Sequence, residues 1–306
     1  MTILASRRFP GAAWAELQDV VYLEGSLAET PPRQDVTALA VVAERIDDAV
    51  LDRFPNAGIV ANYGVGYDAI DVAACVRRGI FVTNTPGVLD AATADLAFAL
   101  ILASRRRIVV GDRAVREGRW AGGWADPDFL GRDVSGATLG IVGLGRIGSA
   151  VARRAAGFDM TVVHHGRGRD RPGWLELDEL LAAADVVSVH VPLTEETRGL
   201  IDARRLALLR DGVCLVNTAR GAVVDEPALV RELAAGRIEA GLDVFAHEPY
   251  VPQELLGLPN VVLTPHVGSA TTETREAMTR VLVDNLLAFE GGNEPPNLVY
   301  PAAEAP

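Results

Sequence analysis

The stretch Ala137-Thr138-Leu139-Gly140-Ile141-Val142-Gly143-Leu144-Gly145-Arg146-Ile147-Gly148 decides the fold of this chain. Its first six residues are apolar and follow Gly136, so they predict a buried strand. A helix is predicted after the glycines, because apolar residues recur there at helical spacing: Ile147, Val151, Ala152 and Ala155. Glycine-rich turns also serve plain helix packing, but one between a strand and a helix lets the backbone approach a pyrophosphate at the helix N-terminus. The stretch therefore predicts a dinucleotide site.

Five more apolar runs follow this strand at the spacing of strand–helix–strand units. Nearly continuous apolar strands predict a parallel sheet covered on both faces. The six strands are expected at 137–142, 161–164, 185–191, 213–217, 238–244 and 261–264. The first third of the chain alternates shorter apolar runs with polar stretches, which predicts a second, smaller parallel α/β sheet. Its strands are expected at 2–4, 20–23, 38–42, 58–61 and 80–82.

Two long helical patterns set the domain boundaries. One helix is predicted from about 92 to 118, with Asp90 and Thr93 as candidate caps, crossing between the domains; its tract 105–107 is expected to be a solvated arginine face. A terminal helix, about 271–289, is closed by glycines and lets the chain return to the first domain. We predict an α/β fold of two Rossmann-like domains with parallel sheets. The substrate domain, 1–93 completed by 272–306, is discontinuous in sequence, and a dinucleotide-binding domain spans 94–271.

Composition excludes several classes of protein. The chain has 306 residues, with 29 basic and 41 acidic side chains and a formal net charge of -12, which argues against nucleic acid or anionic membranes as the main partner. Cys75 and Cys214 belong to no metal-binding pattern, so neither a disulfide framework nor a metal site is expected. No leader-like start and no uninterrupted apolar stretch long enough to span a membrane is evident, so we expect a cytoplasmic protein.

Three polar residues, Arg220, Glu248 and His266, each follow a predicted strand of the larger sheet. Each one alone has an ordinary structural interpretation: Arg220 as part of an ion pair, Glu248 as a cap at the start of a helix, and His266 as a hydrogen-bonded histidine in a turn. Together they are expected to converge, because open α/β sheets place ligands at the carboxyl ends of their strands. A carbonyl that accepts hydride needs a proton donor, which histidine beside a carboxylate can be, and arginine can hold a 2-oxo acid through its fork of donors.

The other histidines at the larger sheet have no predicted catalytic role. His190 ends a strand at the same edge and is expected to pack on the cofactor wall, whereas His247 should point away from Glu248. His164 and His165 fall at the distal ribose end of the dinucleotide, where adenine-side packing or a surface position is expected.

The residues after the second strand of the larger sheet predict which dinucleotide is used. A carboxylate normally accepts hydrogen bonds from the ribose at this place, but here Gly166 is followed by Arg167. The small residue leaves room for a 2′-phosphate, which a guanidinium can pair with, and Arg169 and Arg171 offer further charge. We predict NADPH as the favoured cofactor, with NADH also possible; the alternative is that Arg167 is a solvent-facing loop residue.

These motifs closely resemble the D-isomer-specific 2-hydroxyacid dehydrogenase family, and particularly its glyoxylate and hydroxypyruvate reductases. The resemblance runs from about residue 62 to 269 and is carried by 62–71, 83–87, 143–148, 216–221, Asp243 with 248–249, and 265–269. The pair Gly166-Arg167 is similar to the NADPH-using reductases and departs from the NAD-using members, which carry an acid there. That departure, and the lack of an appended regulatory domain after Pro306, weigh against phosphoglycerate dehydrogenase.

The resemblance implies roles for individual residues. Arg220, Glu248 and His266 would be catalytic. The substrate would be bound by the backbone amides of Val65 and Gly66, together with Arg220 and His266. The cofactor would be contacted by Thr93, Gly143, Gly145, Arg146, Ile147, Gly148, Arg167, Pro192, Thr197, Thr218, Ala219, Asp243 and Gly268. The family's usual homodimer, built around the helical segment before the nucleotide domain, is implied by the same analogy.

We therefore expect a reductase that converts a small 2-oxo acid, glyoxylate or hydroxypyruvate, to the D-2-hydroxy acid, with His266 as the acid and domain closure excluding water. Two alternatives stay open. One is a reductase for a bulkier 2-oxo acid of the 2-ketogluconate or phenylpyruvate type, which the pocket volume near Tyr63, Tyr67 and Trp124 would decide. The other is a dinucleotide-sensing binding protein.

Overall fold

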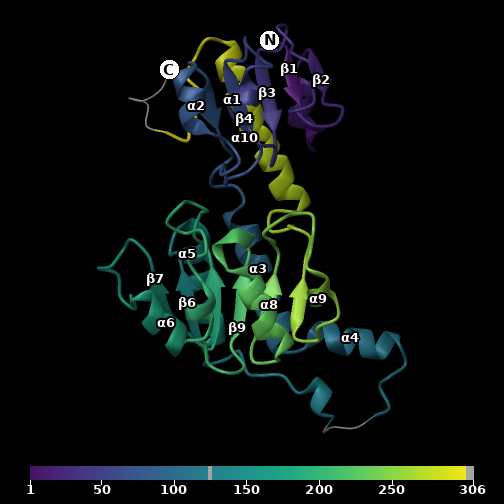
Figure 1. Cartoon of the computed structure of the whole chain (residues 1–306), viewed down its shortest axis with the longest axis vertical. Coiled ribbons are helices and arrows are strands. Elements are labelled where there is room, and N and C mark those ends of the chain that lie inside the picture. Colours follow the sequence, from purple (N-terminus) through teal and green to yellow (C-terminus); the bar gives the residue numbers. More distant parts are fainter. Residues whose placement is uncertain (123–125, 301–306) are drawn as a thin grey trace. The chain divides into compact units, whose positions relative to one another are not determined.

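The chain divides into two compact units, each with its own parallel sheet (Figure 1). Unit 1 is Met1–Leu89 with Ser269–Pro306, and unit 2 is Asp90–Gly268. The computed structural model describes residues 1–122 and 126–300. The boundaries lie a few residues before those expected from the sequence. The predicted fold class, with two parallel α/β sheets and a discontinuous first unit, is confirmed.

Unit 1 has a five-stranded parallel sheet in the order β2-β1-β3-β4-β5. The strands are β1 (Ile3–Ala5), β2 (Val20–Tyr22), β3 (Ala38–Val41), β4 (Ile59–Asn62) and β5 (Phe81–Thr83). Its helices are η1 (Ala12–Glu16), α1 (Asp48–Leu51), α2 (Val72–Arg77) and α10 (Thr272–Glu290). Strands β1, β3 and β4 are buried along their whole length, which explains why their sequences are apolar without alternation.

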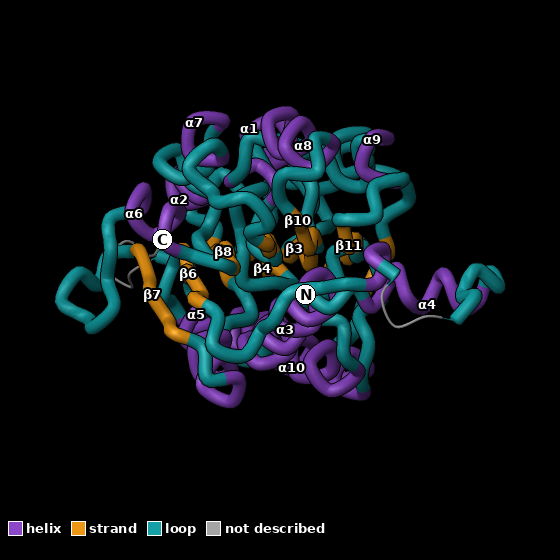
Figure 2. Tube along the Cα trace, turned by 90° about the horizontal axis from the view of Figure 1, so that it is seen from below, coloured by secondary structure: helices purple, strands orange, loops and turns teal. Residues whose placement is uncertain are grey.

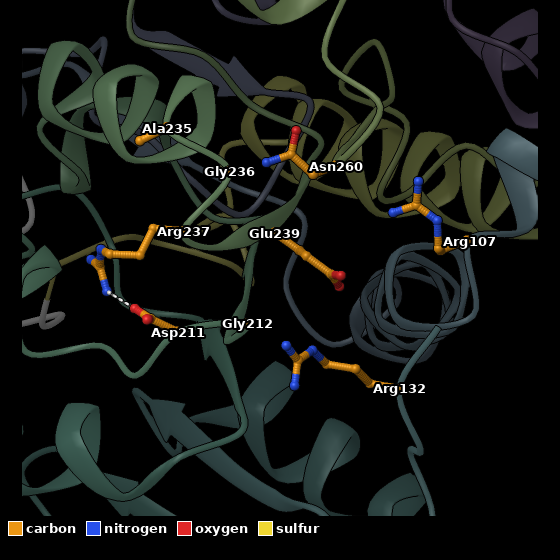
Figure 3. A pocket seen from close by; sticks show the side chains of 9 residues that line it. All are labelled: Arg107, Arg132, Asp211, Gly212, Ala235, Gly236, Arg237, Glu239 and Asn260. Atoms are coloured by element: carbon orange, nitrogen blue, oxygen red, sulfur yellow. Dashed lines mark ion pairs between the residues drawn. The ribbon is translucent and has the colours of Figure 1, made fainter. Parts of the chain in front are cut away.

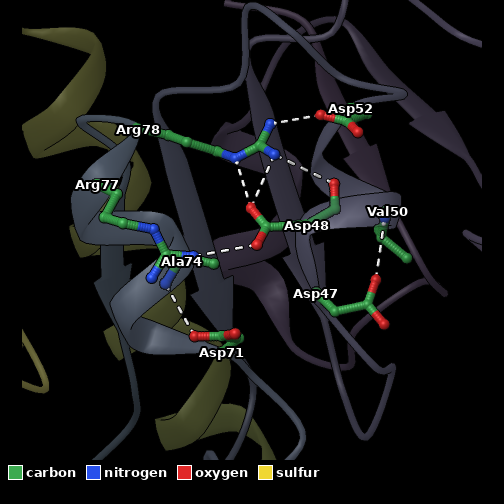
Figure 4. A network of polar contacts seen from close by, with 8 residues as sticks. All are labelled: Asp47, Asp48, Val50, Asp52, Asp71, Ala74, Arg77 and Arg78. Atoms are coloured by element: carbon green, nitrogen blue, oxygen red, sulfur yellow. Dashed lines mark hydrogen bonds and ion pairs between the residues drawn. The ribbon is translucent and has the colours of Figure 1, made fainter.

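Side-chain caps fix where the helices of unit 1 begin. The carboxylates of Asp47 and Asp71 accept hydrogen bonds from amides in the first turns of α1 and α2. The two helices are joined by exposed ion pairs from Asp48 to Arg77 and Arg78 (Figure 4). Because these pairs are exposed, they contribute less to stability than the apolar core beneath them.

Unit 2 has a six-stranded sheet in the order β11-β10-β9-β8-β6-β7, and every pairing in it is parallel. The strands are β6 (Thr138–Val142), β7 (Thr161–His165), β8 (Val186–Val189), β9 (Cys214–Asn217), β10 (Glu239–Leu242) and β11 (Val261–Leu263). All six predicted strands are confirmed. The order reverses between β6 and β8, and such a switch point is where open α/β sheets bind ligands.

Helices cover both faces of this second sheet (Figure 2). One apolar core contains side chains from α6, α7 and α8, and the other contains side chains from α3 and α5. The helices of unit 2 are α3 (Asp90–Arg105), α4 (Ile108–Arg116), η2 (Pro127–Phe129), α5 (Arg146–Ala155), η3 (Ala156–Phe158), α6 (Leu177–Ala183), α7 (Ala203–Leu206), η4 (Gly221–Val223), α8 (Glu226–Ala234) and α9 (Gln253–Leu256). None of the helices in the described ranges has both the length and the apolar character needed to cross a membrane.

The predicted single helix from 92 to 118 is wrong, because the chain breaks into α3 and α4. Arg107 adopts a left-handed conformation with φ of 51°, which ends the regular helix before it. The predicted solvated arginine face is also wrong for Arg105, which is only 6% exposed. Its guanidinium donates to the carbonyl oxygens of Asp133, at 2.9 Å, and Asp185, at 3.1 Å. Both α3 and α4 lie within unit 2, so the expected crossing between domains is not found either.

Candidate functional site

The glycine-rich turn after β6 combines tight packing with open space. An added Cβ at Gly143, where φ is 100°, would lie 2.8 Å from the His190 carbonyl carbon, and one at Gly148 would lie 2.1 Å from the Gly143 oxygen. At Gly145, the residue before α5, an added Cβ would meet nothing within 4 Å. No described side chain caps this end of α5. The turn therefore fits the pyrophosphate of a dinucleotide, with backbone amides available to it.

A second sign of a missing partner lies at the end of β9. The side chain of Thr218 is buried, and its hydroxyl oxygen has no hydrogen-bond partner among the described residues. Buried polar groups normally have hydrogen-bond partners. Thr218 follows β9 at the same edge of the sheet as the glycine-rich turn after β6, so its unpaired hydroxyl fits a bound polar ligand. The backbone amide of the next residue, Ala219, donates a hydrogen bond to the side-chain oxygen of Asn217 at 3.0 Å.

The other residues expected to contact the cofactor lie in three places of unit 2. Thr197 donates its hydroxyl to the Pro192 oxygen at 2.6 Å in the turn after β8. Thr93 and Asp243 both lie next to Gly268, where an added Cβ would be 3.4 Å from a Thr93 carbon and 3.3 Å from an Asp243 oxygen. Arg146 and Ile147 form the first turn of α5. All of them belong to unit 2.

Asp243 organises the turn that carries His266. Its carboxylate accepts from the Thr264 hydroxyl at 2.6 Å and from the amides of Val267 and Gly268, both at 2.8 Å. Burial raises the pKa of Asp243, and these hydrogen bonds oppose that rise. The His266 amide donates to the Asp243 carbonyl at 2.9 Å. His266 itself has φ of 52°, an uncommon conformation for a residue with a side chain and one found often at functional positions.

Glu248 and His266 are in direct contact. The Nδ1 atom of His266 lies 2.7 Å from Oε2 of Glu248, and Oε1 of Glu248 accepts from the Phe245 amide at 3.0 Å. Burial alone would raise the pKa of Glu248. The hydrogen bond and charge of His266, the Phe245 amide and the charge of Arg220 together hold it below its ordinary value. The carboxylate is therefore charged at neutral pH, and Nε2 of His266 is left as the atom that can meet a substrate.

Arg220 is set by the loop after β9. The Asn217 amide group donates to the Arg220 carbonyl at 2.9 Å, and Nη1 of Arg220 donates to the Ala219 carbonyl at 2.7 Å. The next residue must be small, since an added Cβ at Gly221 would lie 2.0 Å from the Phe245 carbonyl carbon. The loop thus packs on the segment that leads to Glu248, and the three residues expected from sequence lie on adjacent loops of one unit. Asn217 and Gly221 fall within the motif 216–221, but the sequence assigns neither a role of its own, because contacts that hold one loop against another have no local sequence signature.

The predicted substrate loop in unit 1 presents its amides. Two asparagines hold its carbonyls: Asn62 donates to the Gly66 oxygen at 2.9 Å, and Asn84 donates to the Val65 oxygen at 2.9 Å. The amides of Val65 and Gly66 donate to no residue in the described part of the chain. Two unpaired amides on adjacent residues suit a carboxylate.

Other side chains named from sequence have ordinary surroundings. Tyr63 is buried and donates its hydroxyl to the Arg275 carbonyl at 2.7 Å, whereas Tyr67 is exposed. Trp124 lies outside the described residues. His190 has its Nε2 atom 2.7 Å from the Ser188 hydroxyl, and burial lowers the pKa of His190 to about 4, so it is neutral.

A pocket of about 580 Å³ lies at the opposite ends of the strands from these residues (Figure 3). Most of its lining residues precede or begin β9, β10 and β11, whereas one precedes α4 and one follows η2: Arg107, Arg132, Asp211, Gly212, Ala235, Gly236, Arg237, Glu239 and Asn260. None of the residues expected to act on substrate or cofactor is among them. Within the described ranges, no three His, Cys, Asp or Glu side chains are grouped so that they could hold a metal ion.

Comparison with known proteins gives consistent matches. Residues 98–268 match the family described as D-isomer specific 2-hydroxyacid dehydrogenase, NAD binding domain. The chain is 48% identical to the glyoxylate reductase of Thermococcus litoralis over 89% of this chain and 88% of the relative. It is 47% identical to that of Pyrococcus horikoshii over 97% and 95%.

Solved structures agree with the sequence matches. The NADPH-dependent glyoxylate/hydroxypyruvate reductase of Sinorhizobium meliloti, in complex with NADP and malonate, superposes with a TM-score of 0.88 at 39% identity, covering 100% of this chain and 97% of that one. The D-lactate dehydrogenase of Aquifex aeolicus, complexed with NAD and lactic acid, superposes with a TM-score of 0.87 at 29% identity, covering 99% and 100%.

Proposed function

The chain belongs to the D-isomer specific 2-hydroxyacid dehydrogenase family, and we propose that it reduces glyoxylate or hydroxypyruvate with NADPH in preference to NADH. It is an NAD(P)-dependent oxidoreductase of small 2-oxo and 2-hydroxy acids, so the predicted family, enzyme class and cofactor type are confirmed. The product is the D-hydroxy acid where a stereocentre forms.

The observation that carries the proposed chemistry is the 2.7 Å contact between His266 and Glu248. Reduction of a 2-oxo acid places negative charge on the carbonyl oxygen, and a proton must reach it. His266 donates this proton from Nε2, while the Glu248 carboxylate at Nδ1 fixes the ring and stabilises the charged imidazole before the transfer. A reduced dinucleotide, held through its pyrophosphate at the glycine-rich turn, would supply the hydride from its nicotinamide ring.

Arg220 has two tasks in this proposal. Its guanidinium binds the substrate's carboxylate and the neighbouring carbonyl oxygen, which selects 2-oxo acids over simple ketones. It also stabilises the charge that develops on that oxygen. The amides of Val65 and Gly66, which donate to no described residue, are proposed as further donors to the carboxylate.

The preference for NADPH rests on the end of β7. Gly166 leaves space beside the ribose, and Arg167 is exposed, with no hydrogen bond or ion pair to any described residue. A guanidinium without a protein partner is available to a 2′-phosphate. The relative from Sinorhizobium meliloti, described as NADPH-dependent, supports the same preference.

His266→Ala tests the proton donor. We expect turnover of glyoxylate to fall by about 10²–10⁴-fold while NADPH binding, followed by fluorescence, is unchanged. His247→Ala is the matched control, because it removes an exposed imidazole nearby that has no proposed role. Turnover within a few fold of the parent protein for His266→Ala would refute the role.

The substrate class is tested by following NADPH oxidation with glyoxylate, hydroxypyruvate, 2-ketogluconate and phenylpyruvate. We expect the highest kcat/KM for the first two acids. A clear preference for either bulkier acid would replace the proposed substrate. No oxidation with any of them would favour a dinucleotide sensor.

We also propose a homodimer formed around α4 and the described residues that flank it, 106–107, 117–122 and 126–132. Ile108 and Val115 of α4, with Trp120 and Leu130 beyond it, are each more than half exposed, and large exposed apolar side chains are typical of interaction surfaces. Light scattering should give twice the mass of the chain, and Val115→Glu should lower the measured mass.

We also propose that the enzyme is located in the cytoplasm. Cys75 and Cys214 are buried and form no disulfide, which suits a reducing compartment. Cell fractionation would test this location.

A further inference from the structure

A loop joins β7 to α6 (Figure 1), and backbone hydrogen bonds close it at its base. Its two ends pair with each other: the His164 amide donates to the Gly173 carbonyl at 2.8 Å, and the Leu175 amide donates to the His164 carbonyl at 2.9 Å. These bonds bring Trp174 beside the first residue of the loop, Gly166. The loop 166–173 contains all three arginines that the sequence offers to a 2′-phosphate.

Trp174 contacts three residues at once, one at the end of β7 and two in the loop. Its indole Nε1 donates to the Gly166 carbonyl at 2.9 Å. One ring contact is with His165, with 5.7 Å between the ring centroids. The other is with the guanidinium of Arg169, whose central carbon lies 5.1 Å from the indole centroid. The indole thus fixes the end of β7, the glycine after it and the middle of the loop.

The three arginines of the loop are not equivalent. Arg169 is held on the face of Trp174, and Arg171 donates to the Leu144 carbonyl in the glycine-rich turn at 3.3 Å. Arg167, between Gly166 and these two arginines, makes no comparable contact with the described part of the chain. Arg169 and Arg171 therefore stabilise the loop, whereas Arg167 is available to a ligand.

We propose that Trp174 is a positioning residue for cofactor selectivity, which holds Gly166 and Arg167 in the arrangement that receives the 2′-phosphate of NADPH. The inference rests on the proposed NADPH preference and adds the residue that prepares the site for it. A loop fixed before binding loses less conformational entropy when the phosphate arrives, so the affinity for the phosphate is higher. The carbonyl of Gly166 is the point at which the indole acts.

The test measures binding of two fragments, 2′,5′-ADP and 5′-AMP, by titration calorimetry. Their affinity ratio reports recognition of the 2′-phosphate alone and does not depend on catalysis. Trp174→Phe keeps an aromatic ring near Arg169 and His165 but removes the Nε1 donor, and Trp174→Leu removes both. We expect the ratio to fall about threefold to tenfold in Trp174→Phe and further in Trp174→Leu, with 5′-AMP binding unchanged.

Two arginine variants bracket the result. Arg167→Ala should lower the ratio by about 10- to 100-fold, whereas Arg153→Ala, which removes an exposed charge from α5, should leave it unchanged. A ratio unchanged in both Trp174 variants would overturn the inference. So would an equal loss for the two fragments, which would show a general loss of structure. If the parent protein itself binds the two fragments equally, both the proposed NADPH preference and the role of Trp174 are refuted.

Discussion

Two acids in the loops around β10 show how local contacts give similar side chains different tasks. Asp243 is 1% exposed, and burial raises its pKa although three donors surround it. Glu248 is about one-third exposed, and its contacts with His266, the Phe245 amide and Arg220 outweigh burial and lower its pKa. Asp243 therefore holds the His266 turn, whereas Glu248 provides the charge.

Glu248→Gln tests that charge at the residue scale. We expect kcat to fall by roughly 10²-fold, because Gln keeps the size of the side chain but not its charge. Glu226→Gln, which alters a carboxylate bonded to the Ala246 amide in the same region, should change kcat by less than about threefold.

The pH at which Glu248 loses its charge is expected to be low. A lowered pKa means that Glu248 loses its charge only when the pH falls below the ordinary value of glutamate, about 4.3. The side-chain carboxyl carbon of Glu248, followed by NMR, should therefore keep the chemical shift of the charged form between about pH 7 and pH 5. A change to the shift of the protonated form within this interval would show that Glu248 titrates there, contrary to its environment.

At the scale of elements, the strand–turn–helix unit separates packing from binding. Gly148→Ala places a methyl group 2.1 Å from the Gly143 oxygen and should lower the free energy of unfolding by about 1–3 kcal/mol. Gly145 has a φ of -80° and open space around it, so Gly145→Ala should leave the stability unchanged. The added methyl group should keep the pyrophosphate from the backbone and lower the NADPH affinity at least about tenfold. Thermal unfolding and calorimetry check both. Equal effects of the two variants on stability would contradict this division of roles.

The end of α3 gives a second test at this scale. Arg105→Ala removes the donors of the Asp133 carbonyl and one of the two donors of the Asp185 carbonyl, which keeps the Cys214 amide. It also removes a buried side chain, so the free energy of unfolding should fall by about 1–3 kcal/mol. Its neighbour Arg106 is exposed, and Arg106→Ala should change stability by less than about 0.5 kcal/mol. Urea unfolding measures both values, and similar losses would mean that burial does not distinguish the two arginines.

At the scale of the whole molecule, each unit has a single thiol in its core. Burial raises the pKa of Cys75, in unit 1, to about 11 and that of Cys214, in unit 2, to about 12, so neither should react with thiol reagents in the native protein. In increasing urea each thiol reports the opening of its own unit. NADPH at 100 times its Kd should stabilise the unit that binds it by about 2.7 kcal/mol. NADPH should therefore raise the urea concentration at which Cys214 is labelled by more than it raises that at which Cys75 is labelled. Equal increases for the two thiols would contradict separate unfolding of the units.

The sequence by itself determined the parallel α/β architecture and the three polar residues at the strand ends. Buried parallel strands require continuous apolar runs, and the glycines at 143 and 148 are required by backbone contacts that no side chain would permit. These are local requirements, so they can be read from neighbouring residues.

Only the tertiary structure decided how distant side chains are used. It broke the long helix at Arg107, buried Arg105 against carbonyls from other segments, and distinguished Arg167 from Arg169 and Arg171. The spacing of residues in the chain does not specify such contacts, because each depends on which segment the fold brings alongside.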